Sequence, residues 1–116
     1  MKNFKKLIVW QRSMELANEV SKVVSLLPNS ERYTYRDQIL RCSISIPSNI
    51  AEGSSRESKK DFKRFLQIAL GSSFELETQI LLLQQNNVID SNQLLQTLNL
   101  NEEVQKMLQT LMKRIL

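Results

Sequence analysis

A sustained seven-residue repeat between positions 62 and 83 limits the possible folds of this chain more than any other feature of its sequence. Apolar or small residues recur there in alternating steps of four and three: Phe62, Leu66, Ala69, Ser73, Leu76, Ile80 and Leu83. This spacing puts them on one helix face, and its persistence is typical of helices packed side by side in a bundle. One long helix is therefore predicted over residues 58–86, with Ser58 as its N-cap and a turn at Asn86-Asn87.

The same kind of periodicity predicts three further helices, over residues 9–27, 35–52 and 91–115. Their predicted buried positions are Trp10, Met14, Ala17, Val20, Val24 and Leu27, then Ile39, Cys42, Ile46 and Ile50, and finally Leu94, Leu98, Val104, Leu108, Leu111 and Ile115. Thr34 with Asp37 resembles a capping box for the second helix, and Asp90 with Gln93 forms a similar pair for the fourth. Gly53 is predicted to end the second helix in the left-handed conformation.

Short connections join these four helices, so consecutive helices are expected to run antiparallel. The predicted fold class is all-α, an antiparallel up-down-up-down four-helix bundle in a single domain over residues 1–116. Gly and Pro number only two each, while hydrophobic residues make up 41% of the chain. That composition argues against disorder and against a turn-rich β-sandwich.

The sequence offers little for catalysis or metal binding. It contains no His, and its two glycines are isolated, so the commonest general base and a phosphate-binding glycine loop are both missing. Cys42 is the only cysteine, which rules out a four-cysteine zinc site and an intrachain disulfide and favours the reducing cytoplasm. No apolar run approaches the roughly 20 residues that span a bilayer. We expect a cytoplasmic protein that is not an enzyme, with no metal, no cofactor and no membrane contact.

The predicted topology gathers cations at one end of the bundle. The start of the first helix, the junction of the second and third, and the end of the fourth all lie there. Eleven Lys and Arg residues belong to these segments: Lys2, Lys5, Lys6, Arg12, Arg56, Lys59, Lys60, Lys63, Arg64, Lys113 and Arg114. We name this set the basic pole. All of its members except Lys2 are candidate nucleic-acid-binding residues, since clustered cations can follow a phosphate backbone.

A simpler interpretation of these charges is a solvated helix surface, on which Glu57 and Asp61 pair with Lys60 and Arg64. A separate group of polar residues is expected where the second and third helices pack. Its members are predicted to form a buried structural network, because a buried carboxylate needs hydrogen-bond partners: Arg41, Asn49, Glu52, Ser72 and Glu75. Gly71, in mid-helix, costs about 1 kcal/mol relative to Ala. It therefore indicates a close neighbouring helix, either in the same bundle or in another subunit.

Two motifs in order carry a family resemblance: SIPSNIAEG at residues 45–53 and FLQIALGS at residues 65–72, followed by ELETQ at residues 75–79. Together with Val9-Trp10-Gln11 and Glu31-Arg32-Tyr33, they resemble the four-helix-bundle proteins encoded within intervening sequences of bacterial 23S ribosomal RNA genes. The resemblance implies a homo-oligomer, commonly a pentamer, without known catalytic activity. A related branch, the accessory proteins of diversity-generating retroelements, binds nucleic acid and a reverse transcriptase through a basic surface. Leu70 departs from a frequent basic residue of the family, and Cys42 from a usual Ala.

These observations lead to one functional hypothesis and one alternative. The hypothesis is a non-catalytic, homo-oligomeric RNA-associated or nucleoprotein-accessory module that binds nucleic acid through the basic pole. The alternative is a protein–protein interaction scaffold without direct nucleic-acid binding. The expected partners are further copies of the chain and RNA or a nucleoprotein.

Overall fold

The protein is a bundle of four long helices. The structure, a computed structural model, describes residues 3–29 and 32–115. The long helices are α1 (Ile8–Ser25), α3 (Asp37–Ser54), α4 (Lys59–Gln85) and α5 (Ser91–Arg114). A short 3₁₀ helix, η1 (Phe4–Lys6), precedes α1, and a π-helical turn, η2 (Arg32–Arg36), leads directly into α3. All four predicted helices are confirmed, with ends within two residues of the predicted bounds.

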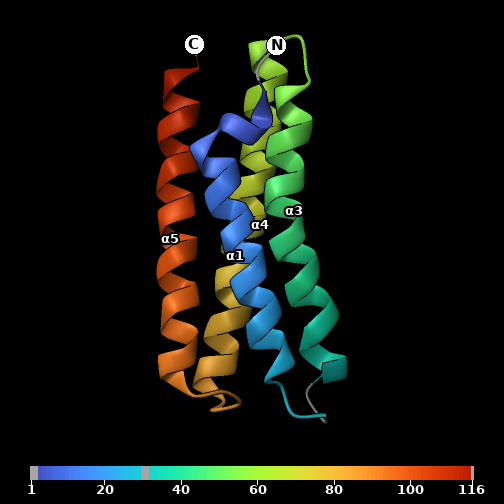
Figure 1. Cartoon of the computed structure of the whole chain (residues 1–116), viewed down its shortest axis with the longest axis vertical. Coiled ribbons are helices and arrows are strands. Elements are labelled where there is room, and N and C mark those ends of the chain that lie inside the picture. Colours follow the sequence, from blue (N-terminus) through green and yellow to red (C-terminus); the bar gives the residue numbers. More distant parts are fainter. Residues whose placement is uncertain (1–2, 30–31, 116) are drawn as a thin grey trace.

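The helices alternate in direction along a rod of 45 × 21 × 20 Å (Figure 1). α1 contacts α3 and α5, and α4 contacts the same two helices, so the four form a closed ring of neighbours. The predicted all-α four-helix bundle is confirmed, and the helix directions in Figure 1 follow the expected up-down-up-down order. Figure 1 also places η1, the α3–α4 connection and the C-terminal end of α5 at the same end of the rod.

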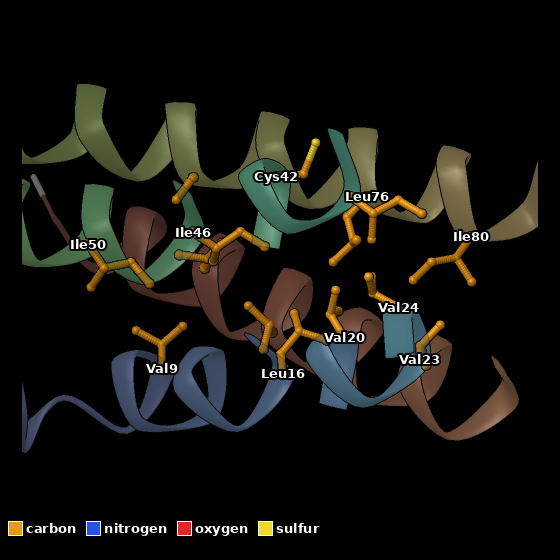
Figure 2. Packing of buried hydrophobic residues seen from close by; sticks show 14 of the residues in the cluster. Val9, Leu16, Val20, Val23, Val24, Cys42, Ile46, Ile50, Leu76 and Ile80 are labelled. Atoms are coloured by element: carbon orange, nitrogen blue, oxygen red, sulfur yellow. The ribbon is translucent and has the colours of Figure 1, made fainter. Parts of the chain in front are cut away.

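Residues from all four helices fill one hydrophobic core. All seven residues of the predicted repeat on α4 are buried, as are the four predicted positions of α3. Figure 2 shows Leu16 and Val20 of α1, Ile46 of α3, and Leu76 and Ile80 of α4 pointing into this interior. Complete burial of each such side chain stabilises the fold by about 1.5–3 kcal/mol. The periodicity of these residues is thus explained by their packing.

The first half of α1 buries a different face from the predicted one. Val9, Ser13 and Leu16 point inward, whereas Met14 is 41% exposed and Trp10 only half-buried. The Trp10 ring instead packs edge-on against Phe4, with ring centroids 5.2 Å apart. The prediction places the large apolar side chains of this segment in the core, whereas the Trp10 ring holds η1 against α1.

The helix starts follow the predicted caps in two of three cases. The Ser58 hydroxyl accepts a hydrogen bond from the Asp61 amide at 3.0 Å, which confirms Ser58 as the N-cap of α4. Asp90 caps α5, although its carboxylate accepts from the amide of Asn92 at 3.1 Å. The predicted Thr34 cap is wrong, because Thr34 lies inside η2 and α3 has no side-chain cap. The backbone is already helical before α3 begins, so no capping position exists at Thr34.

The predicted role of Gly53 as a left-handed terminator is also wrong. α3 continues through Gly53 to Ser54, and neither glycine has a positive φ. A Cβ atom at Gly53 would lie 2.6 Å from the Cβ of Phe65 and 3.1 Å from Cδ1 of Phe62. Gly53 therefore lets the start of α4 pack against the end of α3. After α4, the left-handed residue is Asn87, with a φ of 54°, in the predicted turn.

Gly71 behaves differently. It is exposed, and a Cβ atom there would meet no atom within 4 Å. The prediction that Gly71 allows close packing inside the bundle is wrong. Its other predicted role, contact with another subunit, stays a prediction. None of the described helices combines the length and apolar content that crossing a bilayer requires.

Candidate nucleic-acid interface

Three segments far apart in the sequence meet at the basic pole. Arg114, at the end of α5, lines one hollow together with Arg56 and Lys59 from the α3–α4 junction. It lines a second hollow together with Lys6, which precedes α1. These two hollows place Lys6, Arg56, Lys59 and Arg114 at one end of the rod, the end at which Figure 1 shows η1, the α3–α4 connection and the end of α5. Lys2 lies outside the described residues.

Local contacts hold the segment that carries Lys5 and Lys6. The Asn3 carboxamide oxygen accepts from the amide of Lys5 at 3.1 Å, and Gln11 donates to the Lys5 carbonyl at 2.8 Å. The packing of Phe4 on Trp10 adds an apolar contact. These interactions fix the direction in which η1 approaches α1, so both lysines have a defined place at the pole.

The three arginines in the body of the pole are ion-paired. Arg56 Nη2 lies 2.8 Å from Glu52, and Arg64 Nε lies 3.2 Å from Asp61. Arg12 contacts Glu15 in its own helix and Glu103 of α5, the latter at 2.5 Å. The hydrogen bond to Glu103, opposed by desolvation and aided by the charges of both carboxylates, raises the pKa of the Arg12 guanidinium. Arg12 therefore links α1 to α5 more than it extends the pole.

The other candidate binding residues of the pole have no acidic partner in the part of the chain that the structure describes. Within residues 3–29 and 32–115, seven of the candidate binding residues make no ion pair: Lys5, Lys6, Lys59, Lys60, Lys63, Lys113 and Arg114. Of the pairs that the simpler interpretation requires, Asp61–Arg64 forms, but Lys60 has no such partner in the described part of the chain. The pole thus keeps a net field that local carboxylates do not cancel.

Phe65 organises two of the arginines. The guanidinium carbon of Arg56 lies 4.8 Å from the Phe65 ring centroid, and that of Arg64 lies 4.6 Å from it. Such contacts contribute about 0.5–1 kcal/mol at exposed sites and restrict the guanidinium orientation. Phe65 itself is buried. It was not predicted as part of the site, although its position one residue before a heptad member places it at the edge of the core, beside α3.

The predicted buried network of five polar residues is only partly formed. Asn49 donates to the carbonyl and hydroxyl oxygens of Ser45 at 2.8 and 2.9 Å, and the Ser45 and Ser72 hydroxyls are 2.8 Å apart. Arg41, Glu52 and Glu75 are exposed. The prediction that these charged groups are buried is wrong, because an ionised side chain at the edge of two helices keeps its hydration.

A fully buried polar contact lies instead between α4 and α5. The Ser73 hydroxyl donates to Asn101 Oδ1 at 2.6 Å, and Asn101 Nδ2 donates to the Ser73 carbonyl at 3.0 Å. Sequence reasoning missed Asn101, although its spacing from Leu94, Leu98 and Leu108 is that of the buried face. The pair helps to set the register of the two helices, since removal of one partner would leave a buried group unsatisfied.

Cys42 lies in the core between α3 and α4. Burial, and then the hydrogen bond and charge of nearby Glu75, raise its pKa to about 11. Its Sγ donates to Gln79 Oε1 at 3.6 Å. The thiol is therefore neutral near pH 7 and a poor nucleophile. In the described part of the chain, no three His, Cys, Asp or Glu side chains lie close enough together to hold a metal ion.

Comparison with known proteins agrees with this architecture. A family model described as "23S rRNA-intervening sequence protein" matches residues 5–110. A crystal structure from Bacteroides thetaiotaomicron, of a protein with unknown function from the S23 ribosomal protein family, is similar with a TM-score of 0.86. It is 30% identical, and the match covers 91% of this chain and 99% of that chain. No curated protein matches the chain. The resemblance drawn from residues 45–53 and 65–72 is confirmed, and the chain belongs to the family of 23S rRNA-intervening sequence proteins.

Proposed function

We propose that this protein is a non-catalytic, cytoplasmic RNA-associated module that binds a phosphate backbone through the basic pole. One observation carries the proposal: seven cations from three segments of the chain share one end of the rod without acidic partners in the described part of the molecule. The name of the family links its members to ribosomal RNA genes. Lysines in this arrangement attract phosphates by charge and release counterions from the nucleic acid.

The chemistry of the pole favours binding that depends little on base sequence. Among the aromatic residues beside the pole's cations, Phe62 and Phe65 are buried, and the half-buried Phe4, next to Lys5, packs edge-on against Trp10. They therefore offer no stacking platform for unpaired bases. Lysine side chains contact phosphates as flexible point charges, which position a protein on nucleic acid without reading bases.

We further propose that the protein works as a homo-oligomer, with a pentamer implied by its family resemblance. The outer surface of α4 supports self-association. Ile68, Phe74 and Leu82 are exposed there, close in sequence to Gly71, which has open space around its Cα. Exposed apolar side chains of this kind are typical of protein–protein contacts. Light scattering should give a mass several times 13.5 kDa, and a monomeric mass would contradict the proposal.

A gel-shift series with ribosomal RNA fragments at increasing salt tests RNA binding. With about five phosphates neutralised per subunit, a plot of log affinity against log salt should have a slope of roughly −4 to −5 on duplex RNA and a shallower one on single strands. A protein that forms no complex even at low salt would contradict RNA binding.

Matched charge reversals locate the binding surface. The double variant Lys60→Glu/Lys63→Glu should weaken RNA binding strongly and leave the oligomer intact. Lys22→Glu/Arg36→Glu makes the same change in net charge at the other end of the rod, where α1 ends and α3 begins (Figure 1). Equal losses in both variants would mean that total charge, not the pole, determines binding. If reversal at Lys59, Lys60, Lys63 and Arg64 leaves RNA binding unchanged but removes a protein partner, the scaffold alternative holds.

A further inference from the structure

A groove of about 500 Å³ lies between the start of the chain and the last turns of α5. One wall comes from residues 6–9 and the other from the exposed side of α5. Its lining residues are Lys6, Leu7, Ile8, Val9, Lys106, Met107, Thr110, Leu111 and Arg114. η1 contacts α1 and α3, and the hollow between Leu7 and α5 is open to solvent.

The wall formed by residues 6–9 is held in place before any ligand arrives. The amide of Leu7 donates to the Phe4 carbonyl at 3.0 Å, and the Gln11 side chain donates to the Lys5 carbonyl. Phe4 is in turn packed on Trp10. A groove with fixed walls requires little ordering when it binds a partner, which favours affinity.

The floor of the groove is apolar. Leu7, Met107 and Leu111 are half-buried against the core, and Ile8 is 63% exposed at the rim, the most exposed large hydrophobic residue described. A phosphate backbone has no apolar groups to bury on such a surface, so the floor adds nothing to its binding free energy. Apolar side chains of a ligand would bind favourably there, because their transfer from water to this floor is favourable.

Positive charge surrounds this floor. Lys6 and Arg114 have no ion pair within the described ranges, and no carboxylate is among the residues that line the groove. Lys106 lies 3.3 Å from Glu102, but both groups are exposed, so this pair is weak and open to exchange. A complementary ligand therefore carries apolar groups on one side and carboxylates beside them.

We propose that this groove docks an acidic amphipathic segment of a partner protein. Two or three apolar side chains of the segment lie on Leu7, Ile8 and Met107, and its carboxylates face Lys6 and Arg114. Docking does not require RNA binding. Because Lys6 and Arg114 also belong to the basic pole, the segment and RNA compete for them.

Fluorescence anisotropy with a synthetic probe tests the docking site. The probe is a labelled helical peptide of about 16 residues, with leucines three and four positions apart on one face and glutamates elsewhere. A second peptide of the same composition has its leucines dispersed around the helix. In about 0.15 M salt, where the Debye length is roughly 8 Å, the amphipathic peptide should bind clearly more tightly than the dispersed one.

Two matched pairs of variants locate the peptide. Ile8→Ser should weaken binding about tenfold through lost apolar contact. Ile44→Ser, which changes a similarly exposed isoleucine on α3, should have no effect. Lys6→Gln should weaken binding of the peptide severalfold, whereas Lys63→Gln on α4 should leave its affinity unchanged.

The proposal is overturned by equal binding of the two peptides, by an equal effect of Ile8→Ser and Ile44→Ser, or by a change in oligomeric mass with Ile8→Ser that shows a second copy in the groove. Loss of RNA binding in Ile8→Ser would also overturn it, since RNA would then be the occupant. If the peptide does not bind, the salt series for RNA binding is unaffected. The docking proposal and the RNA-binding proposal are therefore tested separately.

Discussion

Gly53 and Gly71 both lie inside helices, but their surroundings differ. The Cα of Gly53 faces Phe62 and Phe65, so even one methyl group would meet the first turns of α4. Gly71 faces open space and makes no use of its missing side chain within the bundle. Similar small polar residues follow both, which is why local sequence does not distinguish them. The difference arises from which side of each helix faces a neighbour.

Alanine substitutions at these two positions should have opposite effects on the free energy of unfolding. Gly53→Ala should destabilise the protein by about 1–3 kcal/mol, because overpacking outweighs the improved helix propensity. Gly71→Ala should stabilise it by up to about 1 kcal/mol. Urea unfolding monitored by circular dichroism measures both. Similar values for the two variants would contradict the packing at Gly53.

At the scale of elements, helix length was easier to predict than the way each helix begins. α4 starts where Ser58 supplies a cap, because the unpaired amides of a helix start need an acceptor. α3 begins differently, out of the π-helical turn η2, so the amides at its start are already within a helical path. The prediction at Thr34 failed because it assumed an abrupt start for every helix.

Loss of the α4 cap should weaken the fold by a predictable amount. Ser58→Ala should lower the free energy of unfolding by about 1 kcal/mol, since the Asp61 amide loses its acceptor. Ser48→Ala is the matched control, because Ser48 is exposed in the interior of α3. There alanine should stabilise slightly through helix propensity. If thermal unfolding shows equal changes for both, Ser58 does not act as a cap.

At the scale of the whole molecule, the cations divide into two groups. Arg12, Arg56 and Arg64 are engaged by carboxylates, whereas the lysines of the pole that the structure describes, Lys113 among them, have no acidic partner there. Contact with phosphates requires a cation that is free to reach them. Arg12 therefore contributes more to holding α1 against α5 than to the proposed RNA interface, and Arg56 and Arg64 are occupied by carboxylates close to them in sequence.

Two substitutions by uncharged glutamine distinguish the paired from the unpaired cations when RNA affinity is measured at increasing salt. Lys113→Gln should reduce the magnitude of the log–log slope for RNA binding by about one, as expected for the loss of one phosphate contact. Arg12→Gln removes the same charge but should leave the slope unchanged, because Arg12 stays with Glu103 and Glu15. A slope reduced equally in Arg12→Gln would place Arg12 in the interface.

The helical fold and most of its core follow from the sequence alone. Spacing by three and four residues is a property of a single helix. The buried faces of α3 and α4 can therefore be recognised from their own residues, Ile39 to Ile50 and Phe62 to Leu83, without knowledge of the neighbouring helices. Short connections make the antiparallel order the simplest one, and that order brings the start of α1 and the end of α5 to the α3–α4 junction.

Which side chains from different helices meet depends on the folded bundle. Arg12 and Glu103 are 91 positions apart, and their contact depends on how far α1 and α5 are shifted and rotated relative to each other. The same rotation turns Leu16 inward and leaves Met14 exposed. Local periodicity does not set axial offsets between helices, because these come from the packing of whole faces against one another. For that reason the free lysines and the groove beside Ile8 could be recognised only in the folded bundle.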